Sequence, residues 1–230
     1  EELELLHKEG IPYEVVPGVT SSIAVPAYNG IPVTHRDFCS SLHIITGHKK
    51  KGDTYDIDFK ALVNTKGTLV FLMGVSALED ICNSLLQAGM DEKMPAAILQ
   101  KGTTAGQKRI VATVSPLAEE VKKQGIETPA IIVVGKVCAL ADEFAWYEKL
   151  PLFGCKVLVT RPKETISSMA HKLRLLGAEV LELPAIRTEP LEDQSLLKEA
   201  LKELDSYQWI AFTSPIGVKI FFDEMKQNSV

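Results

Sequence analysis

The sequence predicts an α/β protein made of two units, and three observations carry that prediction. Short runs rich in Ile, Val and Leu, bounded by Gly or Pro, alternate with segments whose apolar residues recur at helical spacing. Residues 141–154 follow neither period and end in Pro and Gly, as linkers do. The strand–helix alternation then begins again. Such alternation predicts a mostly parallel or mixed sheet covered by helices.

The first unit opens with a short acidic helix over residues 3–10. Val15 and Val16, the Pro17-Gly18 turn and the hydroxyl residues 20–22 then predict a strand that passes into a helix, with free N–H groups facing a cleft. From residue types alone, this segment is either a ligand-facing turn or a plain capped helix. Five further apolar runs predict strands: 42–46, 68–73, 96–99, 109–113 and 130–134.

Two helices are expected between these strands. Apolar residues at helical spacing predict a helix over 78–86, with Ser76 and Glu79 spaced as a capping box and Gly89 as its end. A second helix is expected to begin at Ser115-Pro116, a cap residue followed by proline.

The second unit repeats the alternation. Strands are expected at 156–160, 180–183 and 209–213, with helices over 166–176 and 197–204 between them. Ser214 followed by Pro215 predicts the start of a last helix.

Composition narrows the function classes. The net charge of −5 argues against a nucleic-acid partner, and no apolar run approaches the roughly 20 residues that span a bilayer. The acidic N-terminus does not resemble a signal peptide. Four scattered cysteines without a Cys-x-x-Cys pair predict reduced thiols in the cytoplasm and no metal site.

An ordered set of segments across the first unit carries a family resemblance: Pro17–Ser22, Gly30–Asp37, Ile45–His48, Thr68–Gly74, Gly102–Thr104, Glu127–Gly135 and Trp146. These segments resemble the uroporphyrinogen-III C-methyltransferase branch of the tetrapyrrole methylases, which use S-adenosylmethionine. The resemblance implies that the first unit is the second lobe of such an enzyme, a mixed sheet with helices.

The resemblance also implies the site residues. Contacts to S-adenosylmethionine are expected from Thr20, Ser21, Met73, Gly102, Pro129 and Ala130. Hydroxyls and exposed backbone groups suit the ribose and the amino-acid end, and a thioether offers soft apolar contact. Without the family, Met73 reads as a core residue, Gly102 as a turn and Thr20-Ser21 as a helix cap. Arg36 is expected to meet carboxylates of the tetrapyrrole substrate.

Some family motifs are not found in this sequence. Residues 1–150 contain no Gly-x-Gly, whereas these methylases begin with a Gly-x-Gly-Pro-Gly-Asp loop and carry a Gly-Gly-Asp-Pro segment. The chain is therefore expected to hold about half of the cofactor site, to have its catalytic residues elsewhere, and not to methylate alone.

The second unit has fewer and less specific matches: Gly154–Pro162, Leu176–Val180 and Phe212–Val218. They resemble the start of uroporphyrinogen-III synthase, an enzyme that closes hydroxymethylbilane without metal or cofactor, and imply a partial flavodoxin-like β-α unit that is inactive by itself. Arg161 and Ser214, at predicted strand ends, are the expected substrate contacts. The expected domains are 1–148 and 155–230, joined by a linker at 149–154.

Three functions remain open. The first is part of a bifunctional enzyme that makes uroporphyrinogen III and methylates it to precorrin-2, acting as a homodimer. The second is a non-catalytic module that binds tetrapyrrole or dimerises. The third is a flavodoxin-like nucleotide binder, which the Arg161-Pro162-Lys163-Glu164 sequence disfavours because it offers no glycine loop for phosphate.

Overall fold

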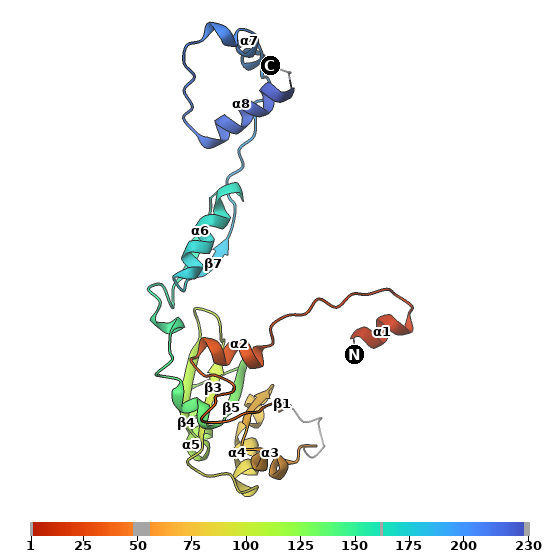
Figure 1. Cartoon of the computed structure of the whole chain (residues 1–230), viewed down its shortest axis with the longest axis vertical. Helices are drawn as coiled ribbons and strands as arrows, with labels where there is room; N and C mark the ends of the chain where they lie inside the picture. Colours follow the sequence, from red (N-terminus) through yellow and green to blue (C-terminus); the bar gives the residue numbers. More distant parts are fainter. Residues whose placement is uncertain (1, 48–55, 162, 228–230) are drawn as a thin grey trace. The chain divides into compact units, whose positions relative to one another are not determined.

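The computed structural model describes residues 2–47, 56–161 and 163–227. The chain divides into two compact units (Figure 1). Unit 1 comprises residues 1–156 and 173–179, and unit 2 comprises residues 157–172 and 180–230.

Unit 1 is built on a five-stranded mixed sheet with the strand order β1-β2-β5-β3-β4. The β1–β2 pair is parallel, and the β2–β5, β5–β3 and β3–β4 pairs are antiparallel. All five strands lie where the apolar runs predicted them, within one residue at each end: β1 (Leu42–Thr46), β2 (Thr68–Leu72), β3 (Pro95–Gln100), β4 (Lys108–Thr113) and β5 (Ala130–Val134).

The strand register brings distant parts of the chain to one edge of this sheet. Thr46 at the end of β1 pairs with Leu72 at the end of β2, and Gln100 at the end of β3 pairs with Ala130 at the start of β5. The segments that follow β1, β2 and β3 therefore meet the segment that precedes β5.

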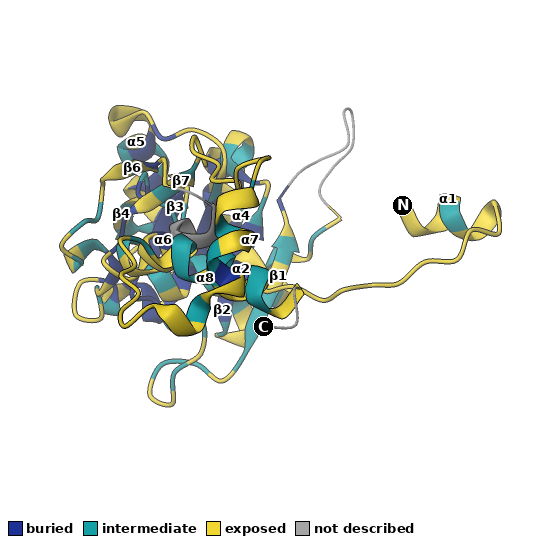
Figure 2. Ribbon diagram, turned by 90° about the horizontal axis from the view of Figure 1, so that it is seen from above, coloured by how far each residue is buried: buried dark blue, intermediate teal, exposed yellow. Residues whose placement is uncertain are grey.

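Alternating residues of the strands face two buried clusters. On β2, Leu69 and Phe71 pack with one cluster and Val70 with the other, and all three are 1% exposed or less. The first cluster includes side chains of α3 (Phe59–Thr65), α4 (Leu78–Gln87) and α5 (Val114–Gln124). Val25 of α2 (Ser21–Tyr28) and Val137 of the 3₁₀ helix η2 (Lys136–Leu140) belong to the second. The central strands β2, β5 and β3 are therefore buried on both faces, whereas the edge strands β1 and β4 are only partly buried (Figure 2 colours each residue by burial).

Three local predictions in unit 1 are wrong. Val15 and Val16 form no strand; they are 67% and 87% exposed, and no described strand pairs with them, so their backbone joins no ladder. Ser76 lies in a 3₁₀ turn (η1, Val75–Ala77), and Ala77 is the N-cap of α4, so the capping box does not form. Helix α5 begins at Val114 after Thr113, one residue before the expected start. The acidic helix is found as α1 (Glu2–Lys8).

Most of the remaining elements lie in unit 2: β6 (Lys156–Val159), α6 (Lys163–Leu175), β7 (Glu179–Glu182), α7 (Ser195–Lys202), the 3₁₀ helix η4 (Leu204–Ser206) and α8 (Pro215–Gln227). Strands β6 and β7 form a two-stranded sheet. The expected strand at 209–213 is absent: these residues are coil, and Trp209 is 90% exposed. Ser214 caps α8 as predicted, because its Oγ accepts a hydrogen bond from the Gly217 N–H at 3.2 Å.

Among the helices in the described part of the chain, none has the length and apolar character that crossing a membrane requires.

Candidate functional site

A cavity of unit 1 lies at the sheet edge where the strand ends meet. Its volume is about 990 Å³. Four segments supply most of the wall, namely the start of α2, the end of β2, the loop after β3 and the segment leading into β5, and Lys156 and Glu179 also line it. The lining includes Ser21, Val25, Leu72, Met73, Ser76, Leu99, Lys101, Gly102, Thr104, Gly106, Thr128, Pro129, Ala130 and Ile131.

Five of the six expected cofactor residues line this one cavity: Ser21, Met73, Gly102, Pro129 and Ala130. Thr20 does not line it. Its Oγ1 accepts a hydrogen bond from the Ser22 N–H at 3.3 Å, so Thr20 is the N-cap of α2. The structure thus brings together residues from four regions of the sequence, and Thr20 holds the helix that presents Ser21.

Met73 is not a core residue. Its φ is +56°, in the left-handed region, and it is 64% exposed. A non-glycine residue in this region is uncommon, and here the backbone turns sharply directly after the buried strand β2. The thioether therefore stands at the cavity wall instead of packing under the sheet.

Gly102 is required by packing as well as by its place in the cavity wall. A Cβ at this position would lie 2.4 Å from Cγ1 of Val25, so any side chain would push α2 away from the loop. The neighbours Lys101 and Thr103 have φ values of +48° and +70°. Thr104 closes this turn, because its hydroxyl donates to the Lys101 carbonyl at 2.8 Å.

The donor set of the cavity suits a ligand that has both polar and apolar parts. Ser21, Ser76 and Thr128 bring hydroxyls to the lining, while Val25 and Leu99 bring aliphatic surface. Hydroxyls and main-chain groups that converge on an apolar pocket are typical of sites for small molecules and cofactors.

A group of side chains that no local sequence pattern reveals holds the C-terminus of α2. Three side chains donate to consecutive carbonyls there: Trp146 Nε1 to Ala27 at 3.0 Å, Gln107 Nε2 to Tyr28 at 3.2 Å, and Arg109 Nη1 to Asn29 at 2.9 Å. Helix ends leave such carbonyls without intrahelical partners. We call Gln107, Arg109, Trp146 and Glu148 the α2 clamp.

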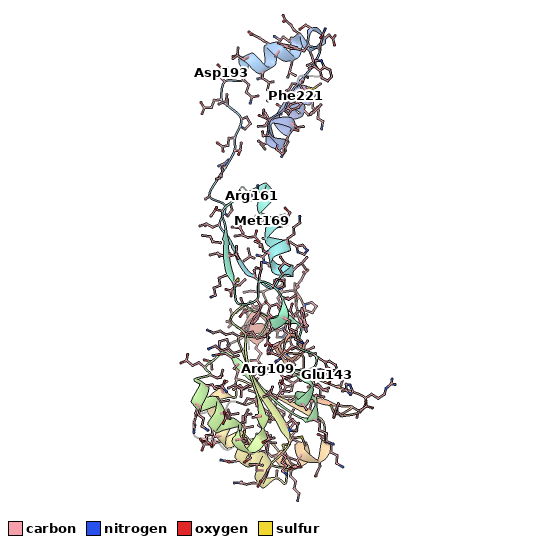
Figure 3. The ribbon with its side chains drawn as sticks, turned by 90° about the vertical axis from the view of Figure 1, so that its left-hand side faces the viewer. Arg109, Glu143, Arg161, Met169, Asp193 and Phe221 are labelled. Carbon is pink, nitrogen blue, oxygen red and sulfur yellow. The ribbon has the colours of Figure 1, made fainter. Side chains whose placement is uncertain are left out.

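Glu148 connects the members of the clamp. Its Oε1 accepts from Gln107 Nε2 at 3.1 Å, and its Oε2 lies 3.2 Å from Arg109 Nη2. The Arg109 side chain is only 14% exposed, and it also bonds Asp142 at 3.0 Å (Figure 3 labels Arg109). The next residue, Tyr147, is buried, and burial raises the pKa of its phenol, as do Tyr28 and Glu179 nearby. Ala141, Trp146, Tyr147 and Glu148 thus make specific contacts within unit 1.

The expected substrate residues lie outside the cavity lining. Arg36 is exposed, in a tight turn closed by hydrogen bonds between the backbones of His35 and Cys39. Arg161 follows β6 in unit 2 and is also exposed, and Ser214 caps α8 (Figure 3 labels Arg161). Substrate contact by these three residues stays a prediction.

Sequence profiles match both parts of the chain. The profile of the Tetrapyrrole (Corrin/Porphyrin) Methylases matches residues 1–118, and that of Uroporphyrinogen-III synthase HemD matches residues 167–230. The order of the two matches is the order that the resemblance predicted.

Curated relatives match over the full chain. A porphyrin biosynthesis protein HemD of Ruminiclostridium josui is 50% identical over 230 residues, which are 100% of this chain and 46% of the relative. A uroporphyrinogen-III C-methyltransferase of Bacillus subtilis (strain 168) is 38% identical over 232 residues, which are 100% of this chain and 47% of the relative. The chain spans about half the length of these relatives.

Solved structures match through the methylase part. Uroporphyrin-III C-methyltransferase from Thermus thermophilus, complexed with S-adenosyl homocysteine, is 31% identical with a TM-score of 0.51, covering 60% of this chain and 59% of that one. A cobalt precorrin-4 methyltransferase with 24% identity and a TM-score of 0.54 shares the fold, covering 60% of this chain and 57% of that one. The chain therefore belongs to the tetrapyrrole methylase family, and its C-terminal residues match the uroporphyrinogen-III synthase family.

Proposed function

We propose that unit 1 binds S-adenosylmethionine in the cavity at the strand ends, as part of an enzyme that methylates uroporphyrinogen III to precorrin-2. The observation that carries this proposal is the convergence of Ser21, Met73, Gly102, Pro129 and Ala130 on one cavity. The family resemblance of the sequence implies the same residues as cofactor contacts, and they come from segments up to 109 positions apart.

The cavity residues fit the parts of this cofactor. When bound, S-adenosylmethionine supplies an electrophilic methyl group on its sulfonium sulfur. Hydroxyls such as those of Ser21 and Thr128 suit the ribose and the amino-acid end, and the aliphatic surface of Val25 and Leu99 suits the adenine. Gly102 brings main-chain atoms to the wall without a side chain between them and a ligand.

The substrate side of the proposal rests on charge. Uroporphyrinogen III and hydroxymethylbilane carry several carboxylates, which guanidinium groups bind through charge-assisted hydrogen bonds. Arg36 of unit 1 and Arg161 of unit 2 are exposed and can meet such groups, and the Ser214 hydroxyl is a third candidate contact. For unit 2 we propose a part in the cyclisation of hydroxymethylbilane.

The activity of the isolated chain, its oligomeric state and its location are also part of the proposed function. Since the chain spans about half of its relatives, we propose that methyl transfer needs residues outside these 230 and that the isolated chain is inactive. We further propose a homodimer in the cytoplasm, without a nucleic-acid or membrane partner.

Titration calorimetry of this chain with S-adenosyl homocysteine tests the cofactor site. Met73→Ala removes an exposed thioether from the wall and is expected to weaken binding by about five- to tenfold, which is roughly 1–1.4 kcal/mol. Met169→Ala is the matched control, because Met169 is a 40% exposed methionine of α6 outside the cavity, and it is expected to leave the affinity unchanged.

Two results would contradict the proposal. One is the absence of saturable binding by the unmutated chain; the other is equal affinity for the Met73→Ala and Met169→Ala variants. Binding of a tetrapyrrole without any binding of S-adenosyl homocysteine would instead support the non-catalytic module.

A further inference from the structure

Gln107 connects two of the segments that line the candidate cofactor cavity. Its side chain is buried, with the residue 6% exposed, and both ends of its amide are engaged. The Oε1 oxygen accepts a hydrogen bond from the Thr103 N–H at 3.0 Å. The Nε2 group donates to the Tyr28 carbonyl at 3.2 Å and to Glu148 Oε1 at 3.1 Å. One amide thus joins the loop after β3 to the end of helix α2.

These two connected elements form adjoining parts of the cavity wall. Helix α2 contributes Ser21 and Val25, and the loop contributes Gly102 and Thr104. They also touch directly, because a Cβ on Gly102 would fall 2.4 Å from the Val25 side chain. A small displacement of α2 along or across its axis would therefore move the loop and change the width of the cavity.

Helix α2 depends on outside contacts for its position. It has only eight residues, and Pro26 inside it lacks the N–H that would bond to the carbonyl four residues earlier. A helix of this length is not stable by itself in water. Its end is instead fixed by the clamp donors and by close packing, since a Cβ on Gly30 would lie 2.7 Å from the Ala141 carbonyl oxygen.

We propose that Gln107 is a positioning residue for the cofactor cavity: it sets the distance between α2 and the loop at 101–106, with Glu148 and Arg109 holding its orientation. Gln107 does not itself line the cavity. Its effect on the ligand passes through Thr103 on one side and Tyr28 on the other. This inference rests on the proposed function, because the ligand is taken to be S-adenosylmethionine.

Gln107→Glu is the informative substitution because Glu has nearly the same shape as Gln. It replaces the Nε2 donor with a second acceptor oxygen. The retained oxygen still accepts from the Thr103 N–H. The other oxygen now faces the Tyr28 carbonyl and the Glu148 carboxylate, so two attractive contacts become repulsive. We expect α2 and the loop to move apart, and the affinity for S-adenosyl homocysteine to fall at least tenfold. Gln87→Glu, at an exposed position of α4, makes the same chemical change and should leave affinity unchanged.

A second substitution separates positioning from a general loss of structure. In Gln107→Glu with Glu148→Gln, the new amide at 148 can donate to the new carboxylate at 107, so one attractive contact returns. We expect the double variant to bind at least threefold tighter than Gln107→Glu alone. Independent structural damage would instead make the double variant weaker than either single variant.

The measurements are calorimetric affinity for S-adenosyl homocysteine and thermal unfolding of the same samples. If the unmutated chain does not bind, the proposed function fails. If it binds and Gln107→Glu binds equally well, the positioning role is wrong while the proposed function stands; lack of rescue in the double variant also overturns it. Should Gln107→Glu not fold, Gln107→Met replaces it, since Met keeps the length of the side chain and removes only the amide's hydrogen bonds to Thr103, Tyr28 and Glu148. A two- to threefold weaker affinity is then expected, and no change overturns the proposal.

Discussion

Units 1 and 2 arise from the same alternation of strands and helices, yet they differ in how much of the apolar pattern is buried. In unit 1 the central strand β5 is flanked on both sides, and Ile132 and Val133 are fully buried. In unit 2 the few buried apolar residues are Val159, Ala170 and Leu201, within the part of the chain that the structure describes. Apolar periodicity thus predicts a helix or strand. Whether its apolar residues are buried depends on the neighbouring elements that pack against it.

The largest expected difference between the units is the cost of a core truncation. Phe71 of β2 is fully buried, so Phe71→Ala should lower the free energy of unfolding of unit 1 by about 3–5 kcal/mol. Amide hydrogen exchange in urea, read peptide by peptide, can follow each unit separately. A matching shift of the transition in the peptides of unit 2 would show that the units unfold together.

The α2 clamp gives the next largest effect. Arg109→Ala removes the donor to the Asn29 carbonyl and leaves Glu148 without its cation, so we expect a loss of about 2–4 kcal/mol. Arg187→Ala in unit 2 is the control, because Arg187 is 87% exposed in its pair with Glu189 and should cost less than about 0.5 kcal/mol. Equal unfolding midpoints for the two variants would contradict a structural role for the clamp.

The two helix caps allow a closer comparison. Thr20→Ala and Ser214→Ala each remove a side-chain acceptor at a helix N-terminus, and each is expected to cost about 1 kcal/mol in its own unit by urea unfolding. Only Thr20→Ala should also weaken binding of S-adenosyl homocysteine, because its helix presents Ser21 to the cavity. Weaker binding after Ser214→Ala would break this distinction.

The smallest expected effect is a difference in the rate of alkylation between buried and exposed cysteine thiols. Burial raises the pKa of Cys82 in α4 from 9.0 to about 11, and it raises that of Cys138 still further. At pH 8 only about one Cys82 thiol in a thousand is ionised, so alkylation by iodoacetamide should reach exposed Cys155 well before Cys82. The raised pKa favours the fold below pH 9, and this contribution falls as the pH rises from about 9 to 11. Rapid labelling of Cys82 would show that the core of unit 1 opens readily.

The local elements of the fold were predictable from the sequence. Runs such as 42–46 and 130–134 match their strands residue for residue, because both ends are marked by turn residues and the apolar side chains are needed inside. The segment 209–213 has the same composition, but a strand also needs a partner to bond with, and no local pattern reveals that.

The candidate site was predictable only in part. A family resemblance located five of the residues that line the cavity. The clamp was missed because its contacts join residues far apart in sequence: Trp146 and Ala27 are separated by 119 positions. Arg109 on the edge strand β4 and Gln107 just before it are polar residues that a local pattern predicts to face solvent, because nothing nearby in the sequence indicates the end of helix α2 that they contact.

The strand order of unit 1 also bears on the order of its assembly during synthesis. Strand β5 lies between β2 and β3 in space but follows β4 in the chain. As the polypeptide emerges from its N-terminus, the β1–β2 and β3–β4 pairs can form early, yet nothing joins them until residues 130–134 are available. Release of the chain before that point would leave two open strand edges, at β2 and β3, that can pair with other chains. The last strand of the sheet is thus the step that protects the nascent protein from aggregation.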